Sequence, residues 1–368
     1  MKKIMSKKIS KIPYGKNVYN YEEINAVIKT LKNSTQMGQS VSSFEKKIAT
    51  LFDKKFGLMV NSGSSALILA LKVLNLKKNS EVITPCLNFG TAISSIIIND
   101  LKPIFVDCNL NTLQIDIDKI EKKITKKTKV LLIPNLIGNI PNWKKINDIA
   151  KKYKLFVIED SADTLGATIN SKSTGKYSDI SITSFYGSHI ISCAGNGGMF
   201  LTNNKKFLDK AKVMRSWGRM STLIKDSENI NKRLGIKLKG INYDQKFVFS
   251  EIGYNFEPSE IGASFGLIQL KKFRKFNSIR NKNFQMHVDF FKKHKKFFIT
   301  PIVLKYVKTN FLAYPIIVKK NSKFSRKKLQ IYLEKNNIQT RPIFSGNSLR
   351  HPAFSNLVNK VNKLNSSK

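Results

Sequence analysis

The sequence predicts an α/β protein with a large, doubly wound, mostly parallel sheet and a smaller α+β domain. Short apolar segments alternate with longer amphipathic ones up to about residue 202. The short segments are continuous apolar runs, as expected for parallel strands that helices cover on both faces. The alternation itself supplies the crossover helices that a parallel sheet requires. After residue 198 the regularity weakens, which favours a second, smaller region.

The individual elements follow from the spacing of the apolar residues. Two amphipathic helices are predicted first, over residues 21–31 and 43–52. The predicted strands are 56–60, 81–85, 103–107, 130–134, 155–159, 180–185 and 199–202. The predicted helices among and after them are 65–74, 91–98, 143–153 and 207–217.

The C-terminal part gives weaker signals. Residues 222–246 are polar, rich in Lys and without a clear period. A helix is predicted over 258–273 as the start of a long connector, followed by a strand over 311–318 and a helix over 325–335. Since no low-complexity linker is present, we expect the parts to pack together. The predicted division is an N-terminal arm and helix, a large cofactor-binding domain and a small C-terminal domain: residues 1–35, 36–255 and 256–368.

Composition narrows the functional classes. No run of 18 apolar residues occurs, so no membrane span is predicted. The N-terminus lacks the apolar stretch of a secretory signal, and we expect a cytoplasmic protein. The three cysteines, Cys86, Cys108 and Cys193, form no Cys-x-x-Cys pair, which argues against a disulfide framework and a clustered metal site.

The net charge of +41 raises the question of nucleic acid. The excess is nearly all Lys and is spread over every predicted helix. Nucleic-acid recognition surfaces tend to place Arg and aromatic side chains at localised positions. We therefore favour a solvated, Lys-rich exterior over a nucleic-acid role, although such a field also attracts an anionic nucleotide substrate.

Small residues between the first strand and the next helix form a candidate phosphate site. Residues 61–66 read Asn-Ser-Gly-Ser-Ser-Ala, so backbone N–H groups and hydroxyls converge at a helix N-terminus. The segment is not a P-loop, because no Gly-Lys-Ser/Thr follows. The alternative is an ordinary helix cap by Ser64 or Ser65. Ser184, at the end of a later strand, is a candidate for a further hydroxyl.

Two further side chains suit an aromatic, cationic ring. Asp160 ends the strand over residues 155–159, where a carboxylate can hold a protonated heterocyclic nitrogen and keep the ring able to accept electrons. Phe89 follows another strand and offers a flat face for stacking. The alternatives are a capping acid and a core aromatic.

A lone imidazole, His189, follows the strand over residues 180–185 and precedes the Gly-rich run at 195–198. Catalytic residues of α/β proteins collect at such strand ends. A single histidine in this place is, however, more often structural. The order of phosphate loop, stacking aromatic, strand-end acid and reactive residue favours a cofactor enzyme over these separate alternatives.

At these residues the chain resembles the DegT/StrS family of pyridoxal phosphate-dependent sugar aminotransferases, of fold type I. The resemblance runs from Tyr14 to about Phe354. The motifs that carry it are residues 61–66, 158–163 (Ile-Glu-Asp-Ser-Ala-Asp), 184–186 (Ser-Phe-Tyr), 252–255 (Ile-Gly-Tyr-Asn) and 340–342 (Thr-Arg-Pro). It implies pyridoxal or pyridoxamine 5'-phosphate as the cofactor and a homodimer with shared active sites.

The resemblance also implies roles for single residues. Asp160 would bind the pyridine nitrogen, and Phe89 would stack on the ring. Asn255 would reach the phosphate from the neighbouring subunit. The other implied residues are cofactor-binding Gly63, Ser64, Asp163 and Ser184, and substrate-binding Arg219 and Arg341.

His189 stands where the family's aminotransferases carry the Lys that tethers the cofactor. Imidazole cannot form that link but acts as a base near neutral pH. The same exchange marks a sub-branch of nucleotide-sugar 3-dehydratases, which act on CDP-4-keto-6-deoxyglucose or GDP-4-keto-6-deoxymannose. The resemblance therefore implies 3-dehydration of a nucleotide-linked 4-keto-6-deoxyhexose in surface polysaccharide (O-antigen) synthesis, with His189 as the base. The segment Trp217-Gly218-Arg219 looks most like the CDP-sugar member.

Three departures qualify this expectation. The neighbourhoods that carry iron–sulfur cysteines in the CDP-sugar enzyme contain none here, so no such cluster is expected, and a reductase partner stays open. The loop after His189 is one residue longer than usual, with Asn196 where Glu is common. The chain stops soon after Arg350, which suggests a short small domain or a truncated reading frame. The alternatives are a catalytically impaired binding or regulatory protein and a sugar aminotransferase.

Overall fold

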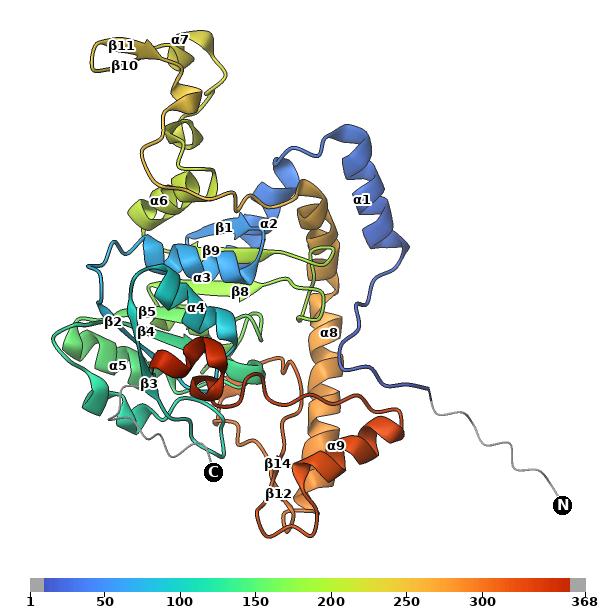
Figure 1. Ribbon diagram of the computed structural model, residues 1–368. Helices are drawn as coiled ribbons and strands as arrows, with labels where there is room; N and C mark the ends of the chain where they lie inside the picture. The colour runs from blue at the N-terminus through green and yellow to red at the C-terminus, as the bar shows by residue number, and fades with distance from the viewer. Residues whose placement is uncertain (1–9, 358–368) are drawn as a thin grey trace.

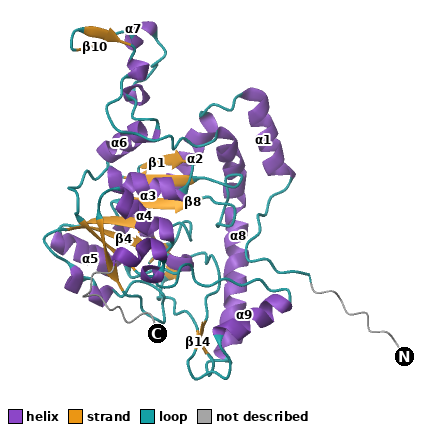
Figure 2. Ribbon diagram, in the orientation of Figure 1, coloured by secondary structure: helices purple, strands orange, loops and turns teal. Residues whose placement is uncertain are grey.

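The computed structural model describes residues 10–357, in which a seven-stranded sheet lies between two layers of helices (Figures 1 and 2). The strands lie in the spatial order β1-β9-β8-β5-β4-β2-β3. Their bounds are β1 (Phe56–Val60), β2 (Glu81–Pro85), β3 (Lys102–Val106), β4 (Thr128–Pro134), β5 (Phe156–Asp160), β8 (Ile180–Ser184) and β9 (Gly198–Thr202). All neighbours from β8 to β3 are parallel, and β9 is antiparallel to both β1 and β8. The predicted doubly wound, mostly parallel sheet is therefore confirmed, with one reversed strand.

Both faces of the sheet are apolar because successive residues of each strand point to opposite sides. In β4, Val130 and Leu132 belong to one core layer and Leu131 to the other. The first layer packs against α3 (Gly63–Lys72), α4 (Gly90–Ile98) and α6 (Lys205–Arg215). The second packs against α2 (Gln39–Leu51), α5 (Trp143–Tyr153) and the first turns of α8 (Glu260–Lys292). The predicted strands of this sheet are all present, with ends shifted by at most two residues.

The predicted connector helix over 258–273 is longer than the apolar spacing indicates, since α8 runs for 33 residues from Glu260. Ser259 caps it by accepting the N–H of Gly262. Figure 1 shows α8 running past the edge of the sheet, with α1 (Tyr21–Asn33) beside its first half and α9 (Arg326–Lys335) beside its far end. One helix thus connects the N-terminal arm, the large sheet and the C-terminal region.

The predicted strand over 311–318 is wrong for most of its length. Only β14 (Ile317–Val318) is extended and paired, with β12 (Phe298–Ile299). The apolar residues before it are used differently, because the ring of Phe311 stacks on that of Phe284 in α8 at 3.5 Å. Ring packing against a helix, and not a ladder of backbone hydrogen bonds, explains the apolar run.

Residues 222–250 form what we call the projecting segment, which extends away from the sheet beyond α6 (Figure 1). It contains the short helix α7 (Ile230–Arg233) and a hairpin of β10 (Ile236–Leu238) and β11 (Ile241–Tyr243). The two residues between these strands, Lys239 and Gly240, have positive φ, as a tight hairpin turn requires. Three-residue strands are too short to give a period, which is why the sequence predicted none.

The predicted division into three parts is not tested by the fold and remains a prediction. The C-terminal β13 (Val307–Lys308) pairs with β6 (Thr168–Ile169), which also pairs with β7 (Lys172–Ser173). Near the end of the described chain, Leu349 and Phe354 pack against residues of the large sheet region. The predicted parts therefore share packed contacts.

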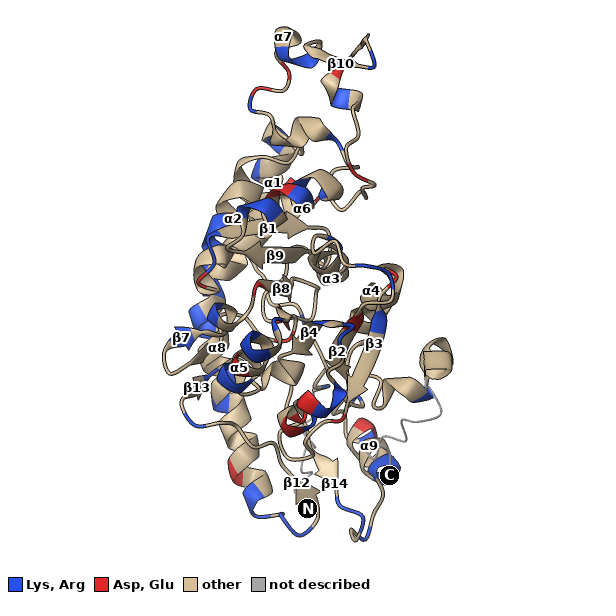
Figure 3. Ribbon diagram, turned by 90° about the vertical axis from the view of Figure 1, so that its left-hand side faces the viewer, with Lys and Arg blue, Asp and Glu red and all other residues tan. Residues whose placement is uncertain are grey.

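Lys and Arg residues occur on helices and loops from one end of the molecule to the other (Figure 3). This distribution agrees with the expected solvated, Lys-rich exterior. Within residues 10–357, no helix combines the length and the apolar character needed to cross a membrane.

Candidate functional site

The loop before α3 meets the end of β8 at the carboxyl edge of the parallel strands. A Cβ atom on Gly63 would lie only 2.8 Å from the Cβ of Ser184. A Cβ atom on Gly198 would lie 2.3 Å from the carbonyl carbon of Ser62. Both glycines are needed for the close approach of these backbones. The structure thus brings Gly63 and Ser184 together, as the sequence predicted.

The N-terminus of α3 keeps free polar groups. The cap is Ser62, whose Oγ accepts the N–H of Ser65 at 3.1 Å, so the alternative cap by Ser64 or Ser65 is wrong. Ser65 in turn donates to the side chain of Asn61 at 2.6 Å. Within the described chain, the hydroxyl and N–H of Ser64 and the N–H of Gly63 have no hydrogen-bond partner. These donors, with the positive end of the helix dipole, form a cup suited to a phosphate.

Asp160 ends β5 and lies in register with Ile182 of β8, at the same edge as the cup. Its side chain is buried, and Oδ1 accepts the N–H of Ala162 at 3.0 Å. Burial raises the pKa of Asp160 to about 6; the N–H of Ala162 opposes this shift and the charge of Glu159 adds to it. Burial disfavours the ionised form of this carboxyl group, and a cation placed beside it would stabilise that form.

Asp163 is a second buried acid beside Asp160. Its Oδ2 accepts the N–H of Ile137 at 2.7 Å. Burial raises the pKa of Asp163 to about 7; the N–H of Ile137 opposes this shift and the charge of Asp160 adds to it. The site therefore holds two carboxyl groups with few donors, next to each other.

Phe89 lies after β2, at the same edge of the sheet as the ends of β5 and β8, because these strands are parallel. Its ring is 55% exposed. One edge contact is made, with Phe344 at 5.7 Å between centroids. A core role for Phe89 is thus excluded, and its ring is available for stacking.

The loop that carries His189 is tied at both sides to the reversed strand pair. Phe185 donates to the carbonyl of Gly197, and Gly187 donates to that of Gly195, both at 2.9 Å. Cys193 donates back to Phe185 at 3.1 Å. His189 itself donates its backbone N–H to Tyr186 at 2.9 Å. Backbone hydrogen bonds within the loop therefore hold the segment around Asn196 in place.

The imidazole of His189 is largely withdrawn from water, and its Nδ1 has no hydrogen-bond partner in the described chain. Burial lowers the pKa of His189 to about 4; the backbone of Ser184 opposes this shift and the charge of Arg280 adds to it. The ring is therefore neutral at physiological pH and able to accept a proton. It lines a cavity of about 530 Å³ between the loop, the N-terminal arm and α8.

The N-terminal arm, residues 12–20, contacts the same loop, and its role was not predicted from the sequence. A Cβ atom on Gly15 would lie 2.9 Å from the Cβ of Ser188. The side chain of Asn17 lies 3.3 Å from the corresponding position of Gly187. Tyr14 lies under the guanidinium of Arg341, 5.3 Å from the ring centroid.

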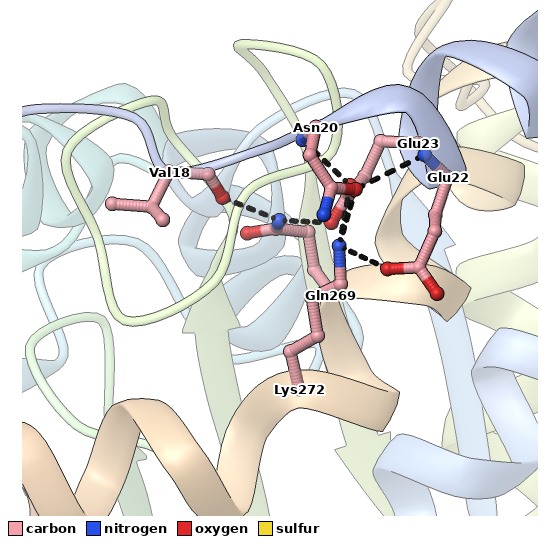
Figure 4. A network of polar contacts seen from close by, with 6 residues as sticks. All are labelled: Val18, Asn20, Glu22, Glu23, Gln269 and Lys272. Atoms are coloured by element: carbon pink, nitrogen blue, oxygen red, sulfur yellow. Dashed lines mark hydrogen bonds and ion pairs between the residues drawn. The ribbon is translucent and has the colours of Figure 1, made fainter.

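A polar network holds the arm to α8 (Figure 4). We call it the arm anchor: Val18, Asn20, Glu22, Glu23, Gln269 and Lys272. Glu23 is fully buried and accepts from Lys272, Gln269 and the N–H of Asn20 at 2.7–3.0 Å. Although burial alone raises it, these hydrogen bonds lower the pKa of Glu23. The capping box Asn20-x-x-Glu23 was a signal for this helix start.

The remaining predicted residues are dispersed. Arg219 stacks on Trp217 and pairs with Phe249, and its contacts do not include the cup. The carbonyl of Asn255 accepts the side-chain N–H of Asn61 at 3.3 Å, so its backbone lies next to the cup of its own chain. Arg341 contacts the ring of Tyr14, a residue whose pKa is raised by burial and further by the charge of Asp163 in the site.

Residues 18–368 match the DegT/DnrJ/EryC1/StrS aminotransferase family. The chain is 32% identical over 364 residues to the lipopolysaccharide biosynthesis protein RfbH of Salmonella typhimurium, covering 96% of this chain and 83% of that one. It is 31% identical over 353 residues to dTDP-4-dehydro-2,6-dideoxy-D-glucose 3-dehydratase of Saccharopolyspora spinosa, covering 93% and 76%.

Among solved structures, the fold is similar to that of E. coli GDP-4-keto-6-deoxy-D-mannose-3-dehydratase with bound hydrated PLP. The TM-score is 0.84 at 30% identity, covering 95% of this chain and 89% of that one. The match in sequence and the match in fold thus extend over almost the whole chain. The chain belongs to the DegT/DnrJ/EryC1/StrS aminotransferase family.

Proposed function

We propose that the protein is a pyridoxal or pyridoxamine 5'-phosphate-dependent 3-dehydratase of a nucleotide-linked 4-keto-6-deoxyhexose. The observation that carries this proposal is His189, a half-buried, neutral imidazole that, by the family resemblance, occupies the position of the cofactor-tethering Lys of the aminotransferases. Relatives about 30% identical over most of the chain bear 3-dehydratase names, which supports the same reaction.

The residues present fit the cofactor. The cup of Gly63, Ser64 and Ser184 has no room for a Cβ at Gly63 and keeps donors without partners, as a phosphate requires. Among the residues that the structure describes, no cation pairs with Asp160 or Asp163, and the exposed side chain of Phe89 has a free face. When bound, the pyridinium ring supplies a sink for electrons, which allows a hydroxyl group to leave the neighbouring sugar carbon.

Each protein residue then has a defined task. Asp160 holds the ring nitrogen in its protonated form, because an ion pair lowers the raised pKa of the acid. The N-terminus of α3 binds and orients the phosphate. His189, which its lowered pKa keeps neutral, can accept a proton at its unpartnered Nδ1 and return it. Without a Lys at this position the chain has no covalent anchor, so these contacts alone retain the cofactor.

We also propose a homodimer. The projecting segment exposes eight large apolar side chains to solvent: Leu223, Ile230, Leu234, Leu238, Ile241, Tyr243, Phe247 and Phe249. Such a surface favours cover by another protein surface. The family resemblance that assigns Asn255 to a neighbouring subunit makes a second copy the favoured partner. Light scattering that gives the mass of one chain at micromolar concentration would contradict this.

The proposed setting is cytoplasmic synthesis of a surface polysaccharide, in line with the lipopolysaccharide role named for one relative. The part of the chain that the structure describes shows no group of three His, Cys, Asp or Glu side chains able to hold a metal. We propose a dehydration without an iron–sulfur cluster because the segments that carry the cluster cysteines in the CDP-sugar enzyme, residues 161–162 and 220–223, contain none here. Glutamate is the amino donor to be tried first, and the product shows whether a reductase acts afterwards.

Product analysis tests the proposal. The purified protein, loaded with pyridoxal phosphate, is incubated with glutamate and the CDP-, GDP- or dTDP-linked 4-keto-6-deoxyhexose. We expect a 3-deoxy product with one oxygen atom less, together with one 2-oxoglutarate and one ammonia per turnover. A 4-amino sugar would show an aminotransferase, and an unchanged sugar with a bound, unreactive cofactor would show a binding protein.

A further inference from the structure

The N-terminal arm joins two parts of the molecule that carry predicted site residues. Ile12 exchanges backbone hydrogen bonds with the segment around Ile338, accepting from Gln339 at 3.0 Å and donating to Asn337 at 2.8 Å. Three residues later, Gly15 packs on Ser188, next to His189. The arm therefore connects the C-terminal segment that holds Arg341 to the loop that holds His189.

Tyr14 lies between these two contacts. Its backbone N–H donates to the side chain of Gln339 at 3.0 Å. Its ring lies against the guanidinium of Arg341, at 5.3 Å from the centroid. Burial raises the pKa of Tyr14; the charge of Asp163 adds to this shift and that of Arg341 opposes it. The phenol is thus protonated and within electrostatic range of both Asp163 and Arg341.

In the described chain, the guanidinium of Arg341 has no carboxylate as its direct partner. Within the described residues it forms no ion pair, and its Nη1 donates to the carbonyl of Thr340 at 2.7 Å. The pKa of Glu334 is lowered chiefly by its hydrogen bond from the N–H of Thr340, and the charge of Arg341 adds a smaller effect. A planar guanidinium with unused donors is well suited to bind two oxygens of a diphosphate.

The position of Tyr14 is fixed from the other side by the arm anchor. Gln269 donates to the carbonyl of Val18 at 2.9 Å, and Lys272 donates to the side chain of Asn20 at 2.8 Å. These bonds join the arm to α8, which lines one cavity together with the arm and the loop that carries His189, so they place the arm opposite that loop. Hydrogen bonds therefore fix the arm, residues 12–20, on both sides of Tyr14.

We propose that Tyr14 is a positioning residue, whose ring holds Arg341 in the orientation that binds the diphosphate of the sugar nucleotide. This inference rests on the proposed function for its substrate class. The ring face, and not the hydroxyl, carries the role, because the guanidinium lies over the face. A cation–π contact of this kind changes binding by about 3- to 30-fold, depending on how far it is desolvated.

The test compares Tyr14→Leu with Tyr14→Phe, and uses Tyr21→Leu as the matched control. Tyr21 directly follows the arm as the first residue of α1 and is 70% exposed. We expect Tyr14→Leu to raise KM for the sugar nucleotide by about 3- to 30-fold with kcat within about twofold of wild type. Tyr14→Phe and Tyr21→Leu should keep the wild-type KM. The absorbance titration with pyridoxal phosphate should be the same in all four proteins.

Several results would overturn the inference. These are a wild-type KM in Tyr14→Leu, equal losses in Tyr14→Leu and Tyr14→Phe, a loss confined to kcat, or a changed affinity for pyridoxal phosphate. Calorimetric binding of GDP, CDP and dTDP separates this test from the proposed function. If the wild type turns over no 4-keto sugar, the proposed function fails, while a 3- to 30-fold weaker nucleotide binding by Tyr14→Leu still supports the role of the ring. Equal binding by both proteins, or no binding by wild type, overturns it.

Discussion

The arm anchor and the candidate site both bury carboxyl groups, but they treat them in opposite ways. In the anchor, Glu23 accepts from an ammonium, an amide and a backbone N–H, and these donors lower its pKa. In the site, Asp160 and Asp163 accept one backbone N–H each, and burial raises their pKa to about 6 and about 7. A buried acid with enough donors stabilises the fold, whereas one with too few is suited to bind a cation from outside.

The effects on stability therefore have opposite signs. A lowered pKa means that Glu23 stabilises the fold above the ordinary pKa of a glutamate, and that this stabilisation is lost as pH falls. A raised pKa means that Asp160 and Asp163 stabilise the cofactor-free protein below about pH 4. That contribution is lost as pH rises to about 7, where both acids ionise. The following predictions test this contrast, beginning with His189, which lies in the same candidate site as the two aspartates.

The largest effect is expected for His189→Asn. Asparagine keeps polarity at this position but cannot accept a proton, so turnover should fall by about 10²- to 10⁴-fold. Affinity for pyridoxal phosphate should stay within about threefold, because the cup, Asp160 and Phe89 remain. The measurements are single-turnover kinetics and a cofactor titration. His294→Asn, at the far end of α8, serves as the control, and unreduced turnover in His189→Asn would refute the role of the imidazole.

A smaller effect is expected for Asp160→Asn. Loss of a charge-assisted contact to the pyridinium should weaken cofactor binding by about 10- to 100-fold. At the same time, the cofactor-free variant should lose less stability than wild type between about pH 4 and pH 7. Thermal unfolding of the cofactor-free proteins across this range checks the sign.

The exposed Asp148→Asn is the control for Asp160→Asn. Like the wild type, it should keep both the cofactor affinity and the pH dependence. If Asp160→Asn binds cofactor as tightly as Asp148→Asn, the acid does not meet the ring nitrogen.

The smallest effects concern the anchor, where two acids share Lys272. Glu23→Gln removes the buried partner and should lower the free energy of unfolding by about 1–3 kcal/mol. Glu22→Gln removes a half-exposed partner and should cost no more than about 0.5 kcal/mol. Urea unfolding at pH 7 measures both. Equal losses in the two variants would show that the anchor behaves like an ordinary surface ion pair.

The sequence predicted those features that depend on neighbouring residues. The strands of the large sheet are apolar runs, and the cup consists of small residues next to a helix start, so both could be recognised locally. The arm anchor could not be predicted in this way, because Glu23 and Gln269 are 246 residues apart in the chain. The contact of Tyr14 with Arg341 joins residues at opposite ends of the chain and therefore also depends on folding.

Other features failed for different physical reasons. The apolar run before β14 predicts a strand, but Phe311 packs its ring on a helix instead. Ring packing and strand pairing leave the same apolar pattern in the sequence. The hairpin of the projecting segment has strands of three residues, which is too short for a periodic signal. The proposed role of Asn255 requires a second copy of the chain, and no pattern within one chain tests it.

The reversed strand β9 has a consequence for how this family changes its chemistry. Because the chain leaves the sheet at Ser184 and returns beside it at Gly198, the intervening loop is fastened at both ends by the same pair of strands. A side chain at position 189 can therefore be exchanged while the backbone that presents it stays in place. An exchange of the side chain at this position thus alters the chemical group that faces the site without altering the strand pair that holds the loop.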